Sequence, residues 1–382
     1  MKKILQLAMA AGIAYSLQSC KKADDGIQPV TNPDSFGTLK SSAACAGPPS
    51  VIGVRITGGS DGCETAGRIY INSTNGNINV RGVFGGTVDV DPGVGVFNLT
   101  GANRSIYNQT FNANGDFLGA IKELQYTESM LFPKDAEGNK YSGKVVGDST
   151  YIIKTNALGV EIWRAKAGPP PPWLRVADFT VTLKLDPWNN VYFSNMEGEL
   201  YKFNPQGQLV YKKIKRDINA RITIDKTGNV YLYGSTGRLQ KISPEGNIIW
   251  EIRNEPTTVT PPQIQALTVD DEGNIYSAGT FIETSDLDPG PGVFKLIPLG
   301  RSMFVQKLNS SGQFVWALQT EGKGVNDNQI IPYDIKLDST GDHIIVAGSF
   351  RGSIFFDAGN KFIATSKGSC DDAFVMGIKQ CK

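Results

Sequence analysis

Two pairs of aspartates on turns of one design are the side chains of this sequence best suited to bind a hard cation. Asp89 and Asp91 lie in the first turn, Asp286 and Asp288 lie in the second, and Pro-Gly follows each pair. Alternate residues of a strand point to the same side, so each pair places two carboxylates on one face. Calcium takes about six to eight oxygen ligands, to which glycine-rich backbone adds carbonyls. Asp-Pro-Gly also forms a tight turn without any ion, so a calcium site and a purely structural turn both stay open.

Other side chains give little indication of catalysis. His343 is the only histidine, and a Ser-His-Asp triad would depend on it. It precedes a run of β-branched residues, which is typical of a residue at a turn or at the rim of a sheet. The sequence also lacks the Cys-x-x-Cys or Cys/His spacing of a zinc site. We therefore expect no catalytic residue, and no cofactor beyond the calcium considered above.

The composition is that of a protein built from many short strands. The 382 residues include 43 glycines, and 38 Lys and Arg against 37 Asp and Glu give a formal net charge of +1. Frequent glycine with β-branched and aromatic residues favours strands joined by tight turns. A near-neutral balance argues against nucleic acid as a partner, because nucleic-acid binding usually needs a strong basic patch.

One turn signature recurs and predicts a repeat architecture. An apolar residue precedes Asp or Asn, and Gly-Asn or a near equivalent follows before a β-prone run. Gly and Asn tolerate positive φ and Asp caps the turn, so each copy predicts a hairpin. A second turn follows in all but the last unit, so a unit holds about four strands, as a propeller blade does. The six copies of the first turn lie at residues 71–77, 135–139, 185–190, 224–229, 269–274 and 337–342.

The last unit lacks a fourth strand at its C-terminal end, and the N-terminal region offers one. Residues 51–57 read as an outermost strand. Antiparallel pairing with residues 374–380 would remove the open edges that otherwise invite aggregation. We therefore expect an all-β fold over residues 50–382, a six-bladed β-propeller closed by pairing of the N- and C-terminal strands.

The cysteines bear on the same pairing. Four remain after Cys20, and an even count in an exported protein favours disulfides, with three possible connectivities. Antiparallel pairing of the two end strands selects one of them, because it brings Cys45 toward Cys381 and Cys63 toward Cys370. Free thiols and a metal site are the alternatives.

The N-terminus resembles the signal peptide of bacterial lipoproteins. A short basic segment and an apolar stretch of signal-core length lead to Leu-Gln-Ser-Cys at residues 17–20, which is similar to a lipobox. The resemblance implies removal of residues 1–19 and acylation of Cys20, and several acyl chains anchor a protein stably to a membrane. An ordinary secretory signal with an incidental cysteine is the alternative. Residues 20–49 lack periodicity and are expected to form a flexible tether.

The residues after the lipobox indicate an address in the envelope. Lys21 resembles the residue that directs lipoproteins to the outer membrane, and Asp24 and Asp25 are similar to export signals of surface-exposed lipoproteins in Bacteroidetes-type bacteria. A solvated run of charges is the alternative. We expect an outer-membrane lipoprotein of the bacterial cell envelope, with a periplasmic or a surface orientation left open.

The repeats themselves resemble known propeller families. The Asp-x-Asp-Pro-Gly turn, Phe-Val-x-Lys-Leu-Asn at residues 304–309 and Phe-Val-Trp-Ala at residues 314–317 are similar to the SBBP repeat family. The middle units, with Asn-Val-Tyr at residues 190–192 and 229–231, resemble NHL or quinoprotein-type repeats. Such repeats imply an architecture and not one shared activity.

Aromatic residues outside the repeat pattern are the candidates for surface contacts. Three tryptophans occupy equivalent repeat positions and are expected to pack between blades, whereas Trp173 and Trp188 break the pattern. Propeller faces carry loops on a rigid scaffold, where binding residues usually lie. We expect a monomeric, non-enzymatic binding or scaffold protein for a protein or glycan partner, joined to the membrane by its lipid. A hydrolase or lyase with its site in the central channel is the alternative.

Overall fold

The computed structural model describes the chain over most of the expected propeller region. The described residues are 48–59, 63–123, 132–168, 178–179, 183–195, 198–214, 220–256, 260–322, 329–357, 362–367 and 370–380. The expected signal peptide, Cys20, Cys45, Trp173 and Cys381 lie outside the described residues.

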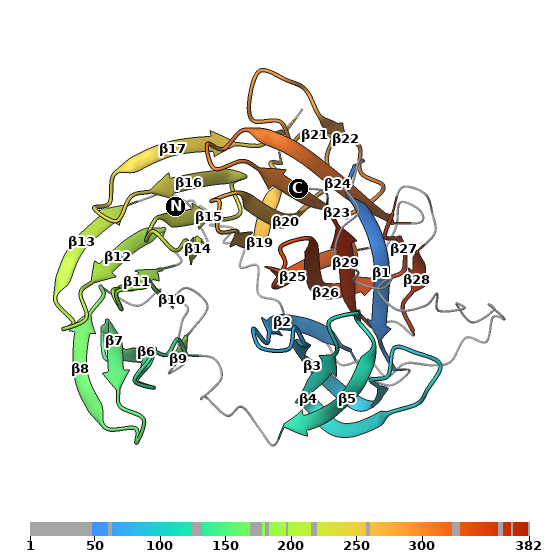
Figure 1. The fold of residues 1–382 in the computed structure, drawn as a ribbon, viewed down its shortest axis with the longest axis horizontal. Helices are drawn as coiled ribbons and strands as arrows, with labels where there is room; N and C mark the ends of the chain where they lie inside the picture. The colour runs from blue at the N-terminus through green and yellow to red at the C-terminus, as the bar shows by residue number, and fades with distance from the viewer. Residues whose placement is uncertain are drawn as a thin grey trace, which may run out of the picture.

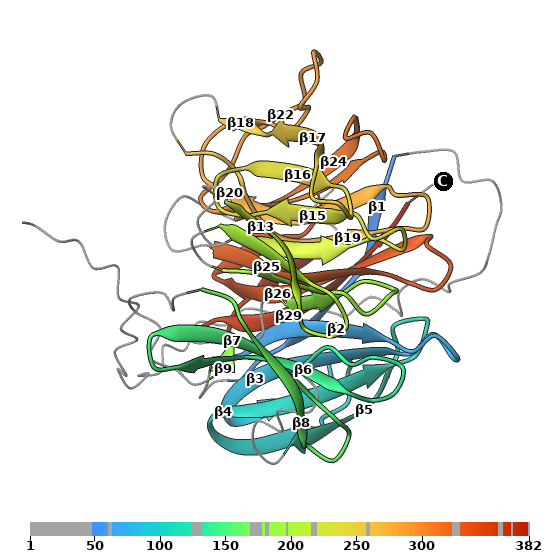
Figure 2. The same ribbon diagram turned by 90° about the vertical axis from the view of Figure 1, so that its left-hand side faces the viewer.

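The described residues form strands and no helix, and none of them could cross a membrane as a helix. Their strands assemble into six antiparallel sheets of four or more strands and one small three-stranded sheet. Figure 1 shows the larger sheets arranged around a common centre, and Figure 2 shows the same arrangement from the side. The chain therefore has a β-propeller-like fold.

In the first three sheets the strands follow one another from the centre of the ring outward. The first sheet holds β2 (Thr65–Ile71), β3 (Ile78–Asp89), β4 (Asn98–Phe111) and β5 (Phe117–Glu123). The second holds β9 (Asp178–Phe179), β6 (Lys140–Val146), β7 (Ser149–Thr155) and β8 (Glu161–Lys166). The third holds β10 (Leu183–Leu185), β11 (Val191–Ser194), β12 (Glu199–Phe203) and β13 (Leu209–Ile214).

The remaining sheets include the one with the most strands, which has six. The fourth sheet holds β14 (Arg221–Ile224), β15 (Val230–Tyr233), β16 (Arg238–Ile242) and β17 (Ile248–Arg253). The fifth holds β19 (Gln263–Val269), β20 (Ile275–Phe281), β23 (Ser302–Leu308) and β24 (Phe314–Gly322), extended by β27 (Ser353–Phe355) and β28 (Ile363–Thr365). The sixth holds β25 (Gln329–Leu337), β26 (His343–Arg351), β29 (Asp372–Lys379) and β1 (Ser50–Thr57). The small sheet joins β18 (Glu255–Pro256), β21 (Ser285–Asp286) and β22 (Lys295–Leu296).

The recurring turn is held by a clamp of three side chains. Asp225 Oδ1 accepts a hydrogen bond from the backbone N–H of Asn229 at 2.9 Å. Asp225 Oδ2 accepts one from Asn229 Nδ2 at 2.9 Å and one from the Tyr231 hydroxyl at 3.2 Å. Gly228 completes the turn with a φ of 80°, a conformation that glycine adopts at little cost. The same Asp, Asn and Tyr contacts recur at residues 135–141, 186–192 and 270–276.

Five of the six predicted turns join an inner strand to its neighbour in the same sheet. The turn at residues 135–139 differs, because it leads into β6 while the inner position beside β6 is held by β9, which follows β8 in the chain. The second sheet is therefore completed at the ring centre by a short segment from the connection to the third.

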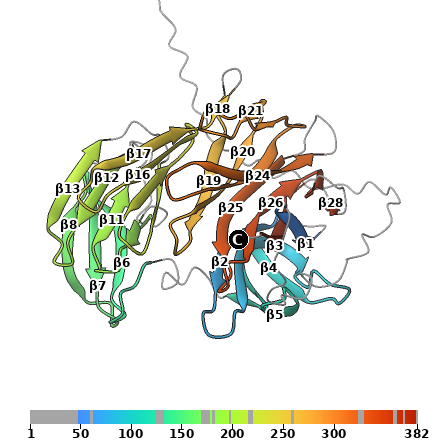
Figure 3. The same ribbon diagram turned by 45° about the horizontal axis from the view of Figure 1, so that its top comes forward.

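The first and last strands of the chain lie side by side. β1 runs antiparallel to β29 at the outer edge of the sixth sheet, with Val51 opposite Ile378 and Thr57 opposite Ala373. The pairing of residues 51–57 with the C-terminal strand is thus present. Figures 1 and 3 show the first sheet next to the sixth and apart from the second, so a fully closed ring of six blades stays a prediction.

Large side chains fill the space between neighbouring sheets. One cluster joins the fifth and sixth sheets and includes Tyr276, Phe350 and Phe374. Another joins the first and sixth sheets and includes Ile78 and Val375. These contacts fix the inner strands β2, β19 and β25 relative to one another, so their side chains meet at the centre in a defined arrangement.

Candidate functional site

A cavity of about 300 Å³ lies where the inner strands meet. Its walls come from five of the six sheets, because β2, β10, β14, β19 and β25 each contribute side chains, together with Tyr233 of β15. Figure 1 shows these inner strands around the centre of the ring. Ligand sites usually occupy clefts of roughly 300–1,000 Å³, so the cavity is large enough for a small molecule or for one end group of a larger one.

Charge is the main property of this cavity. Four cationic side chains line it, whereas its walls carry one carboxylate, Asp334. Asp334 Oδ2 accepts the backbone N–H of Ile69 and Asp334 Oδ1 accepts that of Ile335, both at 2.9 Å, and Lys336 Nζ lies 3.4 Å from Asp334 Oδ1. The one carboxylate is thereby committed to the wall. The four cations are Arg68, Lys184, Arg221 and Lys336.

The other cations of the cavity are not neutralised in this way. Arg221 Nη1 donates to the backbone carbonyl of Gln265, a neutral acceptor. Within the described residues, Arg68 and Lys184 make no hydrogen bond or ion pair through their side chains. Positive charge in the cavity therefore exceeds negative charge, and its potential favours an anion.

Lys184 is the cation whose charge is most easily lost. Burial, followed by the charges of Lys336 and Arg68, lowers the pKa of Lys184 from its usual 10.5 to about 8, and Asp334 opposes this shift. A lysine with such a pKa is mostly protonated at neutral pH, with a minority present as free amine. Lys184 can therefore bind an anion and can also exchange a proton near neutral pH.

Tyr233 forms a buried part of the wall. Burial raises its pKa to about 12, while the nearby charges of Arg221 and Arg68 act in the opposite direction. Both guanidinium groups thus lie within electrostatic range of this hydroxyl, which stays neutral at ordinary pH. Cations from the first, third and fourth sheets are therefore near neighbours in space, although they are far apart in the sequence.

The acidic turn at Asp89 uses its carboxylates to hold the backbone. Asp89 Oδ1 accepts the N–H groups of Asp91 at 3.1 Å and Phe97 at 2.9 Å. Asp91 Oδ1 accepts the N–H of Gly93 at 2.7 Å. These are the contacts of an Asx turn.

The second acidic turn repeats these contacts. Asp286 Oδ1 accepts the N–H groups of Asp288 at 3.0 Å and Phe294 at 2.8 Å, and Asp288 Oδ1 accepts that of Gly290 at 2.8 Å. No group of three or more His, Cys, Asp or Glu side chains in the described part of the chain is placed to hold a metal ion. The hydrogen bonds account for the sequence of both turns, and calcium stays a prediction.

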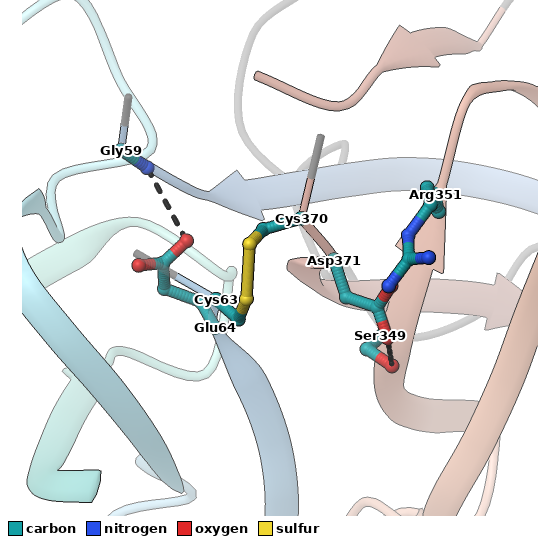
Figure 4. The surroundings of a disulfide bond; sticks show 7 residues. All are labelled: Gly59, Cys63, Glu64, Ser349, Arg351, Cys370 and Asp371. Carbon is teal, nitrogen blue, oxygen red and sulfur yellow. Dashed lines mark hydrogen bonds and ion pairs between the residues drawn. A yellow bond between two sulfur atoms is a disulfide. The ribbon is translucent and has the colours of Figure 1, made fainter. Parts of the chain in front are cut away.

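A disulfide joins Cys63 to Cys370, one of the two pairs proposed from the sequence. Figure 4 shows this bond between the segment that leads into β2 and the segment that leads into β29. Beside it, the backbone N–H of Glu64 donates to the carbonyl oxygen of Asp371 at 2.8 Å, and Arg351 Nη2 lies 2.7 Å from Asp371 Oδ1. The disulfide therefore fastens the first sheet to the sixth near the junction of the two chain ends.

Two buried carboxyl groups accompany the disulfide. Glu64 and Asp372 are both fully buried, and each has one side-chain oxygen without a hydrogen-bond partner among the described residues. Burial, then the charge of Asp372, raises the pKa of Glu64 to about 8. Burial is also the main cause that raises the pKa of Asp372 to about 7. The backbone N–H groups of Gly59 and Lys367 donate to these carboxyls at 3.3 Å and 3.0 Å.

The repeated tryptophans link neighbouring sheets. Trp163 Nε1 donates to the carbonyl of Pro205 in the third sheet at 3.0 Å, and Trp250 Nε1 donates to that of Ser310 in the fifth at 3.3 Å. Trp188, which the sequence indicated as a candidate for surface contacts, is 57% exposed. Its ring also lies against Gly228, since a Cβ on that glycine would come within 2.8 Å of the ring. One side of Trp188 thus packs against the fourth sheet while much of the residue faces solvent.

His343 belongs to the sixth copy of the recurring turn. Its Nδ1 lies 2.9 Å from Asp338 Oδ2, and its backbone N–H donates to Asp338 Oδ1 at 3.2 Å. It is buried at 7% exposure. His343 thus takes the position that asparagine holds in the other copies, in keeping with the expected turn.

The cationic cavity is the feature that sequence reasoning missed, although a signal was present. Each of its four cations precedes the Asp or Asn of its unit's turn by an even number of residues. Alternate residues of a strand face the same way, so an even offset places all four on the face directed to the centre. The offsets are four for Arg68 before Asn72, two for Lys184 before Asp186, four for Arg221 before Asp225 and two for Lys336 before Asp338.

Comparison with known proteins gives distant likenesses in structure. No protein-family model matches the sequence, and no curated protein sequence matches it. A protein of unknown function from Bacteroides caccae is similar over 72% of this chain and 94% of its own, at 13% identity and a TM-score of 0.35. The WD40 β-propeller domain of Doa1 is similar over 86% of this chain and 97% of its own, at 10% identity and a TM-score of 0.43.

Proposed function

We propose that this chain is a lipid-anchored β-propeller of the bacterial cell envelope that binds a ligand in the cavity at its centre without transforming it. The observation that carries the proposal is the convergence of side chains from five sheets on one cavity of about 300 Å³. A pocket assembled from so many rigid elements presents its polar groups in fixed positions, as ligand sites usually do.

The finer parts of the proposal come from the sequence. Six repeats closed into a ring would form the propeller, some of them SBBP-like and the middle ones similar to NHL or quinoprotein-type repeats. Cys20 would carry the lipid, and residues 20–49 would hold the ring at a distance from the outer membrane. The protein would act as a monomer and would bind its glycan or protein partner at the open face of the ring.

Two measurements test these parts separately. For the anchor, cells are labelled with palmitate, and the full-length protein should incorporate the label whereas Cys20→Ala should not. Label on both, or on neither, would remove the lipoprotein proposal.

For the ligand, a panel of neutral and acidic saccharides and of envelope peptides is screened against the full-length protein and Thr223→Trp.

Thr223 lines the cavity and is half-buried, so a tryptophan there should fill the site without altering its charge. A ligand of the cavity should bind the wild type and lose binding to Thr223→Trp, while both proteins unfold at similar temperatures. Ligands that bind both equally, or no ligand at all, would count against the cavity as the functional site.

An enzyme is the second candidate, and Lys184 is the observation that favours it. Its pKa of about 8 lets part of the population accept a proton at neutral pH. In a lyase reaction the amine would take a proton from the carbon next to a carboxylate, a C=C bond would form, and the leaving group on the adjacent carbon would depart with its electron pair. Acidic oligosaccharides that gain ultraviolet absorbance with the wild type and not with Lys184→Met would establish this activity.

A further inference from the structure

We propose that the ligand of the central cavity is a compact anion that carries carboxylate, phosphate or sulfate groups. The inference rests on the proposed function, since it names the chemical class that the cavity would accept. It starts from the distribution of charge on the walls: four cations from four different sheets face one carboxylate.

The one carboxylate of the cavity cannot neutralise the four cations. Asp334 holds two backbone N–H groups at 2.9 Å and lies 3.4 Å from Lys336. In the described part of the chain no hydrogen bond or ion pair joins Arg68 or Lys184 to an acid, Asp334 acts on Lys184 only through its charge, and Arg221 donates to a backbone carbonyl. Like charges gathered in a half-buried site repel one another, and an anion bound between them would replace that repulsion by attraction.

The donor types fit oxyanions. Arginine presents a planar fork that matches the two oxygens of a carboxylate or of a phosphate, and lysine adds a mobile point charge. Arg68 lies on β2, Lys184 on β10 and Arg221 on β14, so an anion touching all three would connect the first, third and fourth sheets.

The size of the cavity limits the ligand. A volume of about 300 Å³ is at the small end of ligand sites, which suits a small acid or the acidic end group of a glycan. Tyr233 and Leu267 add apolar surface to the wall, so a carbon-bearing anion should bind more tightly than an inorganic one.

Isothermal titration calorimetry on the full-length protein in non-ionic detergent tests this at constant ionic strength. The probes are phosphate, citrate and a glucuronate-terminated oligosaccharide, with the matching glucose-terminated oligosaccharide as the neutral control. Binding of citrate alone would identify a free small acid as the source, and binding of the glucuronate-terminated chain would identify a glycan. Either result supports the inference when the neutral chain binds at least about tenfold more weakly, as loss of a charged hydrogen bond predicts.

Variants show whether the anion occupies the cavity. Arg68→Gln and Lys184→Gln should each weaken binding by about tenfold or more, whereas Lys184→Arg should retain it. Lys226→Gln and Arg164→Gln remove the same charges from exposed ion pairs and should leave affinity unchanged. Equal affinity in all variants would place the anion elsewhere and overturn the inference.

Thr223→Trp separates the inference from the proposed function. If neutral ligands bind the wild type and lose binding to Thr223→Trp while every anion fails, the anion inference is wrong and the cavity is still a binding site. If no probe of either kind binds a folded wild-type protein, the inference and the proposed function fail together.

Discussion

Glu64 and Asp372 are two fully buried carboxyl groups whose charges repel one another at the junction of the first and sixth sheets. Glu64 precedes β2 directly, and Asp372 is the first residue of β29. Ionisation of either group places a charge in a buried site, which the charge of Lys367 and one backbone N–H for each carboxyl compensate only in part. The protonation of this pair should therefore govern the stability of the junction between the two ends of the chain.

Stability should therefore decline as pH rises through the neutral range. The folded-state pKa values of Glu64 and Asp372, about 8 and about 7, lie above their usual 4.5 and 3.8. Between these pKa values the folded state binds more protons than the unfolded state. The contribution of this pair to the free energy of unfolding is therefore largest below about pH 4. As the pH rises, it falls by up to about 1.4 kcal/mol per pH unit for each carboxyl. Urea unfolding from pH 5 to pH 9 measures the slope.

Glu64→Gln provides the comparison for this slope, because a neutral amide cannot ionise. The variant should lose part of the pH dependence and gain stability relative to the wild type at pH 8. Asp271→Asn, at a side chain that is 84% exposed, should leave the slope unchanged. A wild-type slope that persists in Glu64→Gln would assign the titration to other groups.

Loss of the disulfide should destabilise the whole ring. Cys63 and Cys370 are separated by 307 residues, and a cross-link over so long a loop restricts the unfolded chain by about 3–5 kcal/mol in the chain-entropy model. The double variant Cys63→Ser/Cys370→Ser should unfold at correspondingly lower urea concentration. Reduction of the wild type should destabilise it at least as much, because it would also open the second predicted pair, Cys45 and Cys381. An unchanged urea midpoint in the double variant would contradict the prediction.

The acidic turns should be indifferent to calcium. Asp89 Oδ1 accepts two backbone N–H groups, and the side-chain oxygen of Asn can accept the same two. Asp89→Asn should therefore cost less than about 1 kcal/mol, and Asp89→Ala about 1–2 kcal/mol because both donors lose their acceptor. Thermal unfolding with calcium and with a chelator should coincide. A rise in melting temperature with calcium that disappears in Asp89→Asn would favour the ion site instead.

Anion binding should weaken in alkaline solution. Below its pKa of about 8 Lys184 carries a charge, and above it the charge is lost, so the affinity for citrate should fall by about tenfold between pH 7 and pH 9. Arg68, Arg221 and Lys336 also line the cavity and should supply the remaining affinity. In Lys184→Arg the guanidinium stays ionised, and the same titration should be nearly flat. A parallel fall in both proteins would exclude Lys184 as the titrating group.

The parts of the fold that depend on local contacts were predictable from the sequence. Asp225, Gly228 and Asn229 fall within five residues and define their turn whatever surrounds it. The pairing of β1 with β29 is a long-range contact, and it was predictable only because the repeat count showed a strand missing from the last unit. The inner position of β9 was not predictable, because a two-residue pairing leaves no pattern in the sequence.

The cavity depends on contacts of another kind. Arg68 and Lys184 lie 116 positions apart, since 184 − 68 = 116, and they meet only because the intervening sheets curve around a centre. Each cation taken singly reads as an ordinary polar position on a half-buried strand. Their even spacing before the turns becomes informative once the blades are placed in a ring, because the ring fixes which face of each inner strand is directed to the centre.

The pairing of β1 with β29 also sets the order in which the molecule can be completed. The first strand is synthesised hundreds of residues before its partner, so β1 has an exposed edge until β29 is available. Such long-range pairing slows folding, and unpaired strand edges recruit other chains. A chain that lacks β29 would keep that edge permanently and should therefore form aggregates rather than a slightly smaller ring.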